Sequence, residues 1–109
     1  MTVFELSQQS GIRVLAMPAP EREIEGVYVG DLLSRCMSRV TEGCLWITIM
    51  SNINIIAVAS LTDVACIVLA EGVSLDDSVR TTAEQKGVNV YTSEKTAYEL
   101  AAMLASLKK

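Results

Sequence analysis

Short apolar runs along the chain alternate with longer segments whose apolar residues recur every three or four positions. The short runs favour strands and the longer segments favour amphipathic helices. The predicted strands are residues 12–16, 27–29, 45–49, 66–69 and 88–91. The predicted helices follow Thr2, span 31–40 and 53–61, and begin near 74 and after 93. Because strand and helix units repeat, the sequence predicts a single three-layer α/β domain over 1–109, with a mostly parallel sheet of about five short strands flanked by helices.

Particular residues mark the predicted helix ends. Thr2 and Glu5 match a capping box, in which a hydroxyl and a carboxylate each accept an amide hydrogen bond. Ser74 and Ser93 precede two further helices as expected N-caps, and Gly11 and Gly87 are expected to end helices in the left-handed conformation. The expected buried face of helix 31–40 consists of Leu32, Leu33, Cys36, Met37 and Val40.

An uncharged run extends from Gly43 to Thr62, and about 20 uncharged residues are typical of a transmembrane helix. Ser51, Asn52 and Asn54 interrupt this run. Because Ser and Asn cap helix starts, the cluster predicts a turn between a strand and a helix. Central parallel strands are apolar on both faces, so a strand joined to an apolar helix imitates a membrane span. The sequence therefore predicts no membrane segment.

The helix at 53–61 carries apolar residues around most of its circumference and needs cover on several sides. Two explanations remain open. A second copy of the chain packs on this helix, or on the one from Asp31, in a homodimer. Alternatively, the loop 18–25, which contains two prolines and an acidic stretch at 21–25, lies over the helix. In either case the loop 21–25 is expected to be exposed.

Composition restricts the class of protein. The chain has 109 residues, 50% of them hydrophobic and 20% charged, which predicts a folded domain. A net charge of −4 offers no positive field for nucleic acid or an anionic membrane. The odd number of cysteines, Cys36, Cys44 and Cys66, with no CxxC spacing, predicts reduced core residues and a cytoplasmic location. The N-terminus lacks a signal-peptide pattern.

Little catalytic chemistry is available. The sequence contains no histidine, which removes the commonest general base and the commonest metal ligand. It has neither a P-loop nor a G-x-G-x-x-G pattern for phosphate chemistry. We therefore expect no catalytic residue, no metal site and no cofactor, and we predict that the protein is not an enzyme.

One candidate ligand site remains. In open parallel sheets, ligands bind beyond the carboxyl ends of the strands, where loops and helix N-termini present free amides. Glycine permits close approach of a ligand to the backbone, and Ser and Asn side chains orient polar groups. The predicted ligand-binding residues are Gly30, Asp31, Ser51, Asn52 and Asn54, and the same rim includes 71–72 and 92–93. The alternative is that all of them only cap helices and form tight turns.

The segment REIEGVYVGDLL, residues 22–33, resembles the DRTGG domain family. The resemblance extends over nearly the whole chain and includes residues 42–43, 46–49, 57–59, 71–72 and 98–99. Glu21 stands where the family signature has Asp before Arg22, and no Thr-Gly-Gly follows. The resemblance implies an α/β fold similar to the N-terminal domain of HPr kinase/phosphorylase. It also implies a regulatory or assembly role, since DRTGG domains accompany CBS domains in inorganic pyrophosphatases and also occur in phosphotransacetylases.

These observations lead to three functional hypotheses. The first is a cytoplasmic regulatory module that forms a homodimer and binds a small molecule, such as a nucleotide or phosphorylated metabolite, or a protein partner. The second is a purely structural interaction domain whose apolar helix is the contact surface. The third is an enzyme, which would require a polar pocket around Asp31, Ser51 and Asn54.

Overall fold

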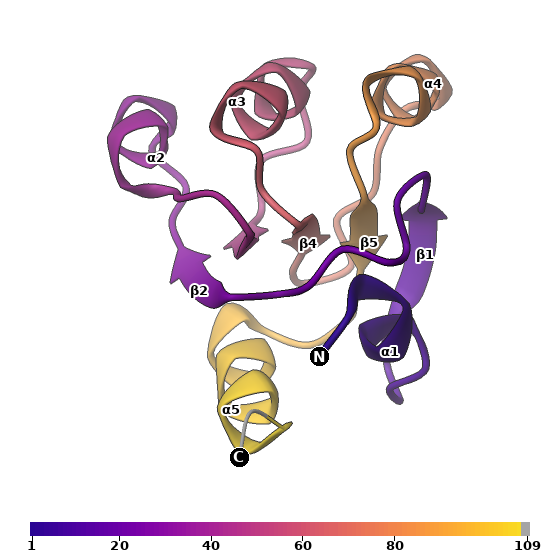
Figure 1. The fold of residues 1–109 in the computed structure, drawn as a ribbon, viewed down its shortest axis with the longest axis vertical. Helices are drawn as coiled ribbons and strands as arrows, with labels where there is room; N and C mark the ends of the chain where they lie inside the picture. The colour runs from indigo at the N-terminus through magenta and orange to yellow at the C-terminus, as the bar shows by residue number, and fades with distance from the viewer. Residues whose placement is uncertain (108–109) are drawn as a thin grey trace.

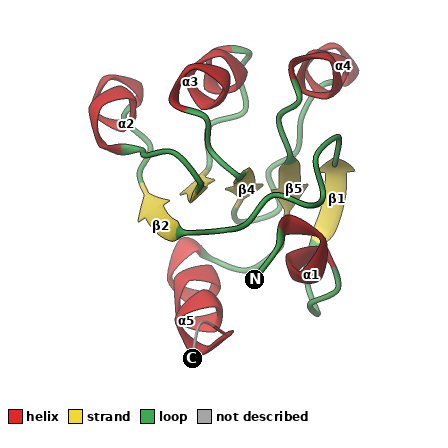
Figure 2. Cartoon of the chain, in the orientation of Figure 1, coloured by secondary structure: helices red, strands yellow, loops and turns green. Residues whose placement is uncertain are grey.

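A five-stranded sheet forms the middle layer of the domain (Figures 1 and 2). The computed structural model describes residues 1–107. The strands are β1 (Arg13–Ala16), β2 (Gly26–Val29), β3 (Cys44–Thr48), β4 (Cys66–Leu69) and β5 (Val90–Thr92). They are ordered β1-β5-β4-β3-β2, with β2 to β5 parallel and β1 antiparallel to β5. The predicted three-layer, mostly parallel α/β fold is confirmed.

The helices cover both faces of the sheet (Figure 1). Helices α2 (Leu33–Arg39), α3 (Asn54–Thr62) and α4 (Asp77–Lys86) lie on one face, and α1 (Val3–Ser7) and α5 (Ala97–Leu107) lie on the other. Successive crossovers between parallel strands keep the same hand, so the helices that connect β2 to β5 share one face. Helix α1 begins with the predicted capping box, in which the Glu5 amide donates to Thr2 Oγ1 over 3.1 Å.

Alternate residues of the central strands supply two cores. Trp46 packs beneath α2 and α3, whereas Leu45 and Ile47 pack against the α1 and α5 side. All residues of β3 and β4 are buried, as expected for strands that have a neighbour on each side. The uncharged run therefore divides into β3 and α3, and among residues 1–107 no helix has both the length and the apolar character needed to span a bilayer.

The predicted buried face of helix 31–40 is partly wrong. Cys36 and Val40 are buried, but the side chains of Leu32 and Met37 are 64% and 52% exposed. The physical reason is position: α2 lies over the edge strand β2 and has a neighbouring helix, α3, on one side (Figure 1). An amphipathic pattern indicates which face is apolar but not whether the fold supplies cover for all of it.

Three expected helix ends are also wrong. Helix α1 ends at Ser7 with Gln8 as its C-cap, so Gly11, although left-handed, lies in the turn before β1. Helix α4 begins at Asp77, after Asp76 rather than Ser74. Helix α5 begins at Ala97 because Thr96 and Glu99 form a second capping box, with 2.9 Å between the Thr96 amide and Glu99 Oε1. Ser93 stays in the extended chain, since its amide donates to the Leu69 carbonyl.

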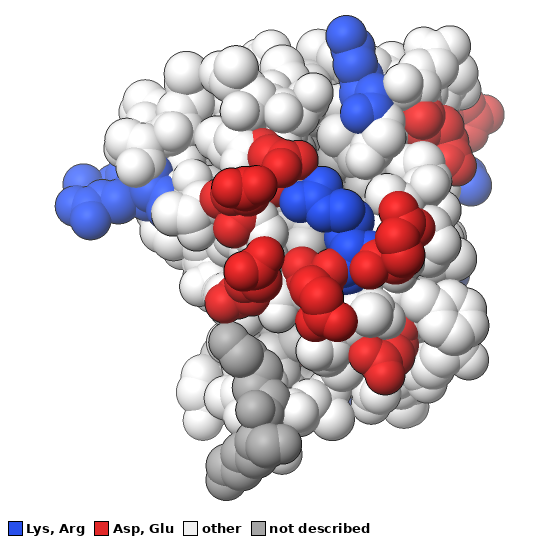
Figure 3. All heavy atoms as spheres, in the orientation of Figure 1, with Lys and Arg blue, Asp and Glu red and all other residues white. Residues whose placement is uncertain are grey.

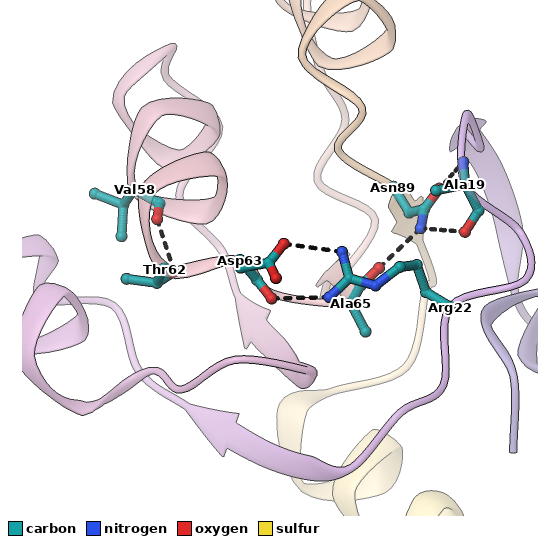
Figure 4. Close-up of polar contacts among 7 residues, drawn as sticks. All are labelled: Ala19, Arg22, Val58, Thr62, Asp63, Ala65 and Asn89. Atoms are coloured by element: carbon teal, nitrogen blue, oxygen red, sulfur yellow. Dashed lines mark hydrogen bonds and ion pairs between the residues drawn. The ribbon is translucent and has the colours of Figure 1, made fainter.

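A long crossing segment, residues 17–25, joins β1 to β2 at opposite edges of the sheet and passes the amino ends of the strands between them (Figure 1). We call it the strap. Figure 4 shows that Asn89 holds it: its side-chain carbonyl accepts from the Ala19 amide at 2.9 Å, and its NH2 group donates to the carbonyls of Ala19 and Ala65, each at 2.8 Å. The strap is therefore fixed to the fold.

The strap also reaches the end of α3 (Figure 4). Arg22 donates to the Asp63 carboxylate and to the Asp63 carbonyl, each over 3.0 Å, and Asp63 ends α3 in the left-handed conformation. Ile24 is buried, so the expectation of an exposed loop at 21–25 is only partly correct. Because Leu61 remains 78% exposed, the strap does not provide the cover that α3 needs.

We expect Asn89→Ala to lower the free energy of unfolding by about 3 kcal/mol, because it leaves the part-buried backbone groups of Ala19 and the buried carbonyl of Ala65 without hydrogen-bond partners. Urea unfolding followed by far-UV circular dichroism measures this loss. Gln85→Ala, at an exposed position on α4, is the matched control and should change the value by less than about 0.5 kcal/mol. Equal effects of the two variants would show that Asn89 does not anchor the strap.

Tyr91 should make the fold sensitive to alkaline pH. Its hydroxyl is buried and donates to the Val3 carbonyl at 2.7 Å, and burial raises the pKa of the phenol. The folded chain therefore keeps the proton at a pH where the unfolded chain releases it, so stability falls as pH rises above the ordinary tyrosine pKa of about 10.

The test compares the wild type with Tyr91→Phe by urea unfolding between neutral and alkaline pH. At neutral pH the variant should be less stable by about 1 to 2 kcal/mol, because the Val3 carbonyl loses its donor. Above the tyrosine pKa this difference should shrink by up to about 1.4 kcal/mol per pH unit. A difference that stays constant with pH would contradict the assignment.

Candidate functional site

The predicted site residues do come together, at the carboxyl ends of neighbouring strands. Gly30 and Asp31 follow β2, and the residues from Ser51 follow β3, its parallel neighbour. Asp31 Oδ1 accepts hydrogen bonds from the Thr48 hydroxyl at 2.8 Å and from the Ile49 amide at 2.9 Å. The carboxylate therefore ties the carboxyl ends of β2 and β3 to each other.

Two further members of this group also have partners within the fold. Asn52 Oδ1 accepts from the Asn54 amide at 2.9 Å, at the start of α3, and the Gly30 carbonyl accepts from the Trp46 indole at 3.1 Å. The side chains of Ser51, Asn52 and Asn54 are exposed. The geometry thus gives Gly30, Asp31 and Asn52 structural roles, and binding of a ligand by the five residues stays a prediction.

The faces on which the following helices lie point to a different part of the rim formed by the carboxyl ends of the strands. After β2, β3 and β4 the chain continues into helices on one face of the sheet, whereas after β5 it continues into α5 on the opposite face (Figure 2). Ligands of open α/β sheets bind where neighbouring connections diverge in this way. The sequence showed the order of the elements but not the face on which each helix lies, so it favoured the β2–β3 end.

The divergence point between β4 and β5 is closed by backbone hydrogen bonds. The Glu71 amide donates to the Lys95 carbonyl at 2.9 Å, and the Gly72 amide donates to the Ser93 carbonyl at 2.8 Å. Open space lies beside it, between the end of β5 and the start of β1. This cavity, which we call the β1–β5 cleft, has a volume of about 370 Å³ and is lined by Gly11, Ile12, Arg13, Thr92, Ser93 and Glu94.

A second hollow is an apolar groove between α2 and α3. The α2–α3 groove has a volume of about 230 Å³ and is lined by Leu33, Met37, Asn54, Ala57, Val58 and Leu61. Neither helix contains Asp or Glu. Figure 3 shows acidic side chains gathered over the middle of the molecule, around the strap, and a basic side chain at the end that carries α2. The residues that line the groove are therefore uncharged, and the only charged residues of the two helices are Arg35 and Arg39 on α2.

The cysteines are core residues, as predicted. Cys36, Cys44 and Cys66 are free and buried, and burial raises the pKa of each thiol. Raised thiol pKa values keep these groups protonated and unreactive at neutral pH. Within residues 1–107, no group of three side chains is arranged to hold a metal ion.

Nearly the whole chain matches the model of one known domain family. The model of the DRTGG domain matches residues 5–107. The chain belongs to the DRTGG domain family. No curated protein matches it significantly. Arg22, which the sequence resemblance placed at the arginine of the family signature, contacts Asp63 within the fold of this DRTGG domain.

The DRTGG domain is also similar to a solved structure, that of the CBS and DRTGG domains of the regulatory region of Clostridium perfringens pyrophosphatase complexed with the activator diadenosine tetraphosphate. The TM-score is 0.66 at 13% sequence identity, and the match covers 84% of this chain. It spans 40% of that chain. At this identity the likeness shows a shared fold.

We expect Asn52→Ala to lower the free energy of unfolding by about 1 kcal/mol through loss of the cap on the Asn54 amide. Ser51→Ala, one residue earlier and also exposed, is the control and should have little effect. Thermal or urea unfolding of both variants measures the difference. A ligand role for Asn52 requires, in addition, weaker binding of a phosphorylated probe such as AMP, and unchanged stability of Asn52→Ala would contradict the capping role.

Proposed function

We propose that this DRTGG domain is a non-enzymatic, cytoplasmic regulatory module that works as a homodimer and responds to a small ligand, a nucleotide or a phosphorylated metabolite. Membership of the DRTGG family supports a regulatory role, as does the likeness to the regulatory region of an activator-binding pyrophosphatase. The observation that carries the homodimer is the α2–α3 groove.

The groove exposes apolar side chains that a monomer would leave in water. Leu61 and Met37 lie on its two walls and are 78% and 52% exposed, and Leu32 and Ile53 are exposed at the starts of the same helices. Contiguous exposed apolar surface of this kind is typical of protein contact sites. Burying it in a dimer would supply the cover that the sequence of α3 requires.

Charge favours a second copy of the chain as the occupant. Two chains that each carry −4 repel one another unless they meet through surfaces that lack acidic groups. The α2–α3 groove is such a surface, since the helices that form it contain no Asp or Glu. A twofold contact between two grooves would pair apolar walls and keep the acidic strap faces away from the interface.

The same helix offers a route from a ligand to the interface. Asn54 lines the groove and is also the first residue of α3, where its amide is capped by Asn52 at the carboxyl edge of the sheet. A ligand held by Ser51 or Asn52 would act directly on the position of α3. A ligand at this end of the carboxyl rim would regulate by changing the dimer affinity.

We expect the wild-type chain to sediment as a dimer and Leu61→Glu to sediment as a monomer, with the dissociation constant raised at least about tenfold, because the carboxylate would be buried in an apolar contact. Ser60→Glu carries the same charge on the same helix at an exposed position that does not line the groove, so it should remain a dimer.

Sedimentation velocity over a range of protein concentrations provides the measurement. Wild-type chain that stays monomeric at all concentrations would overturn the homodimer. If Ser60→Glu dissociates the dimer as strongly as Leu61→Glu, the interface lies elsewhere on α3. Unfolding curves of both variants establish that each is folded, so loss of the dimer is not confused with loss of the fold.

A further inference from the structure

The β1–β5 cleft combines an open volume with an unusual set of donors. Its walls come from the segment before β1 and the segment after β5, which meet because β1 is antiparallel to β5, with Arg13 opposite Thr92. A volume of about 370 Å³ is within the range of small-molecule sites. Ile12, which is half-buried, adds an apolar wall. The cleft therefore suits a ligand larger than a bare ion.

Cationic groups flank this cleft from two directions. Arg13 lines it from β1. Lys95 extends across from the β5–α5 connection, where its Cε and Nζ lie 3.0 and 3.7 Å from the point where a Cβ on Gly11 would stand. Neither cation forms an ion pair with any residue from 1 to 107. The charge of Lys95 helps to lower the pKa of Glu99, but no carboxylate in the described part of the chain is in direct contact with either cation, so both remain available to an anion on a chain with a net charge of −4.

Backbone amides add donors at the same place. Gly11 and Glu94 both line the cleft, and within the described part of the chain neither amide donates a hydrogen bond. Ser93 contributes a hydroxyl whose oxygen accepts from the Lys95 amide at 3.1 Å. Guanidinium groups together with free backbone amides are the donors that proteins use for phosphate.

Glu94 lines the cleft, but its carboxylate is turned toward another loop. Both carboxylate oxygens of Glu94 lie 2.9 Å from the point where a Cβ on Gly72 would stand, so this side chain extends over the β4–α4 connection. Glu71 is exposed on that same connection. At the β2–β3 end of the edge, by contrast, the Asp31 carboxylate lies at the centre of the site and would repel a phosphate.

We propose that the β1–β5 cleft binds a small organic phosphate, with its phosphate held by Arg13, Lys95 and the amides of Gly11 and Glu94, and its organic part against Ile12. The proposal rests on the ligand-sensing part of the proposed function and is independent of the homodimer. It places the ligand beside β5 and β1 instead of at the carboxyl ends of β2 and β3, where the sequence predicted it.

The test is a titration of the full chain, labelled with ¹⁵N, with AMP, glucose 6-phosphate or inorganic phosphate up to about 10 mM, a range that detects millimolar affinity. At least one of the organic phosphates should shift the amide signals of Gly11, Ser93 and Glu94. Adenosine and glucose, which lack the phosphate, should not. Arg13→Gln and Lys95→Gln should each weaken binding by about tenfold.

Arg39→Gln is the matched control, because it removes the same charge from an exposed position on α2, at the opposite edge of the sheet. Its affinity should equal that of the wild type. Equal binding of inorganic phosphate and both organic phosphates would overturn the organic ligand class. Shifts confined to Ser51, Asn52 and Asn54 would overturn the cleft and retain ligand sensing. No shift with any probe would overturn both, whereas the oligomeric state is measured separately.

Discussion

The hydrogen bonds of the Asn89 side chain hold the strap, the long connection between β1 and β2 on which the order of the strands depends. The chain must pass from β1, at one edge of the sheet, to β2 at the other, and it does so as the strap across the amino ends of the buried strands. Polar backbone that crosses the end of an apolar sheet needs partners, and Asn89 supplies them to Ala19. Arg22 provides a second attachment at Asp63.

This crossing has a consequence at the far end of the sheet. Because β1 enters the strap from its own carboxyl end, its first residue lies beside the carboxyl end of β5. Arg13 and Gly11 are thereby carried to the rim where parallel α/β sheets bind ligands. The amino edge, in turn, is occupied by the strap and by the acidic groups around it (Figure 3). The two ends of the strands therefore differ: the strap crosses the amino ends, whereas the carboxyl ends carry the proposed ligand cleft.

The elements were largely readable from sequence because they depend on local signals. The apolar run at 66–69 is β4 to the residue, and Thr2 with Glu5 forms the predicted capping box of α1. The errors arose where tertiary position decides. Periodicity placed Leu32 and Met37 on an apolar face, and only the location of α2 at the edge of the layer leaves them exposed.

The site was harder to derive for the same reason. The carboxyl-edge rule drew attention to Asp31 and Asn52, and both do lie at that edge, where they bond to neighbouring backbone. No local pattern marks Arg13, since an arginine at the start of a short strand usually faces solvent. Its nearness to Ser93 follows from an antiparallel pairing between segments far apart in the chain, which sequence periodicity does not report.

The positions of the two proposed contact regions limit how they can communicate. The β1–β5 cleft lies beside the outer strand β1, and the α2–α3 groove lies toward the opposite outer strand, β2. In a dimer formed through the grooves, the clefts would stand at the outer ends, so neither subunit could contribute a residue to its partner's ligand. A ligand signal would have to cross the fully buried strands β4 and β3, whose close packing transmits small shifts as a unit. The alternative is that the ligand acts locally on β1 and α5, and then the dimer serves to present two independent sensors rather than to couple them.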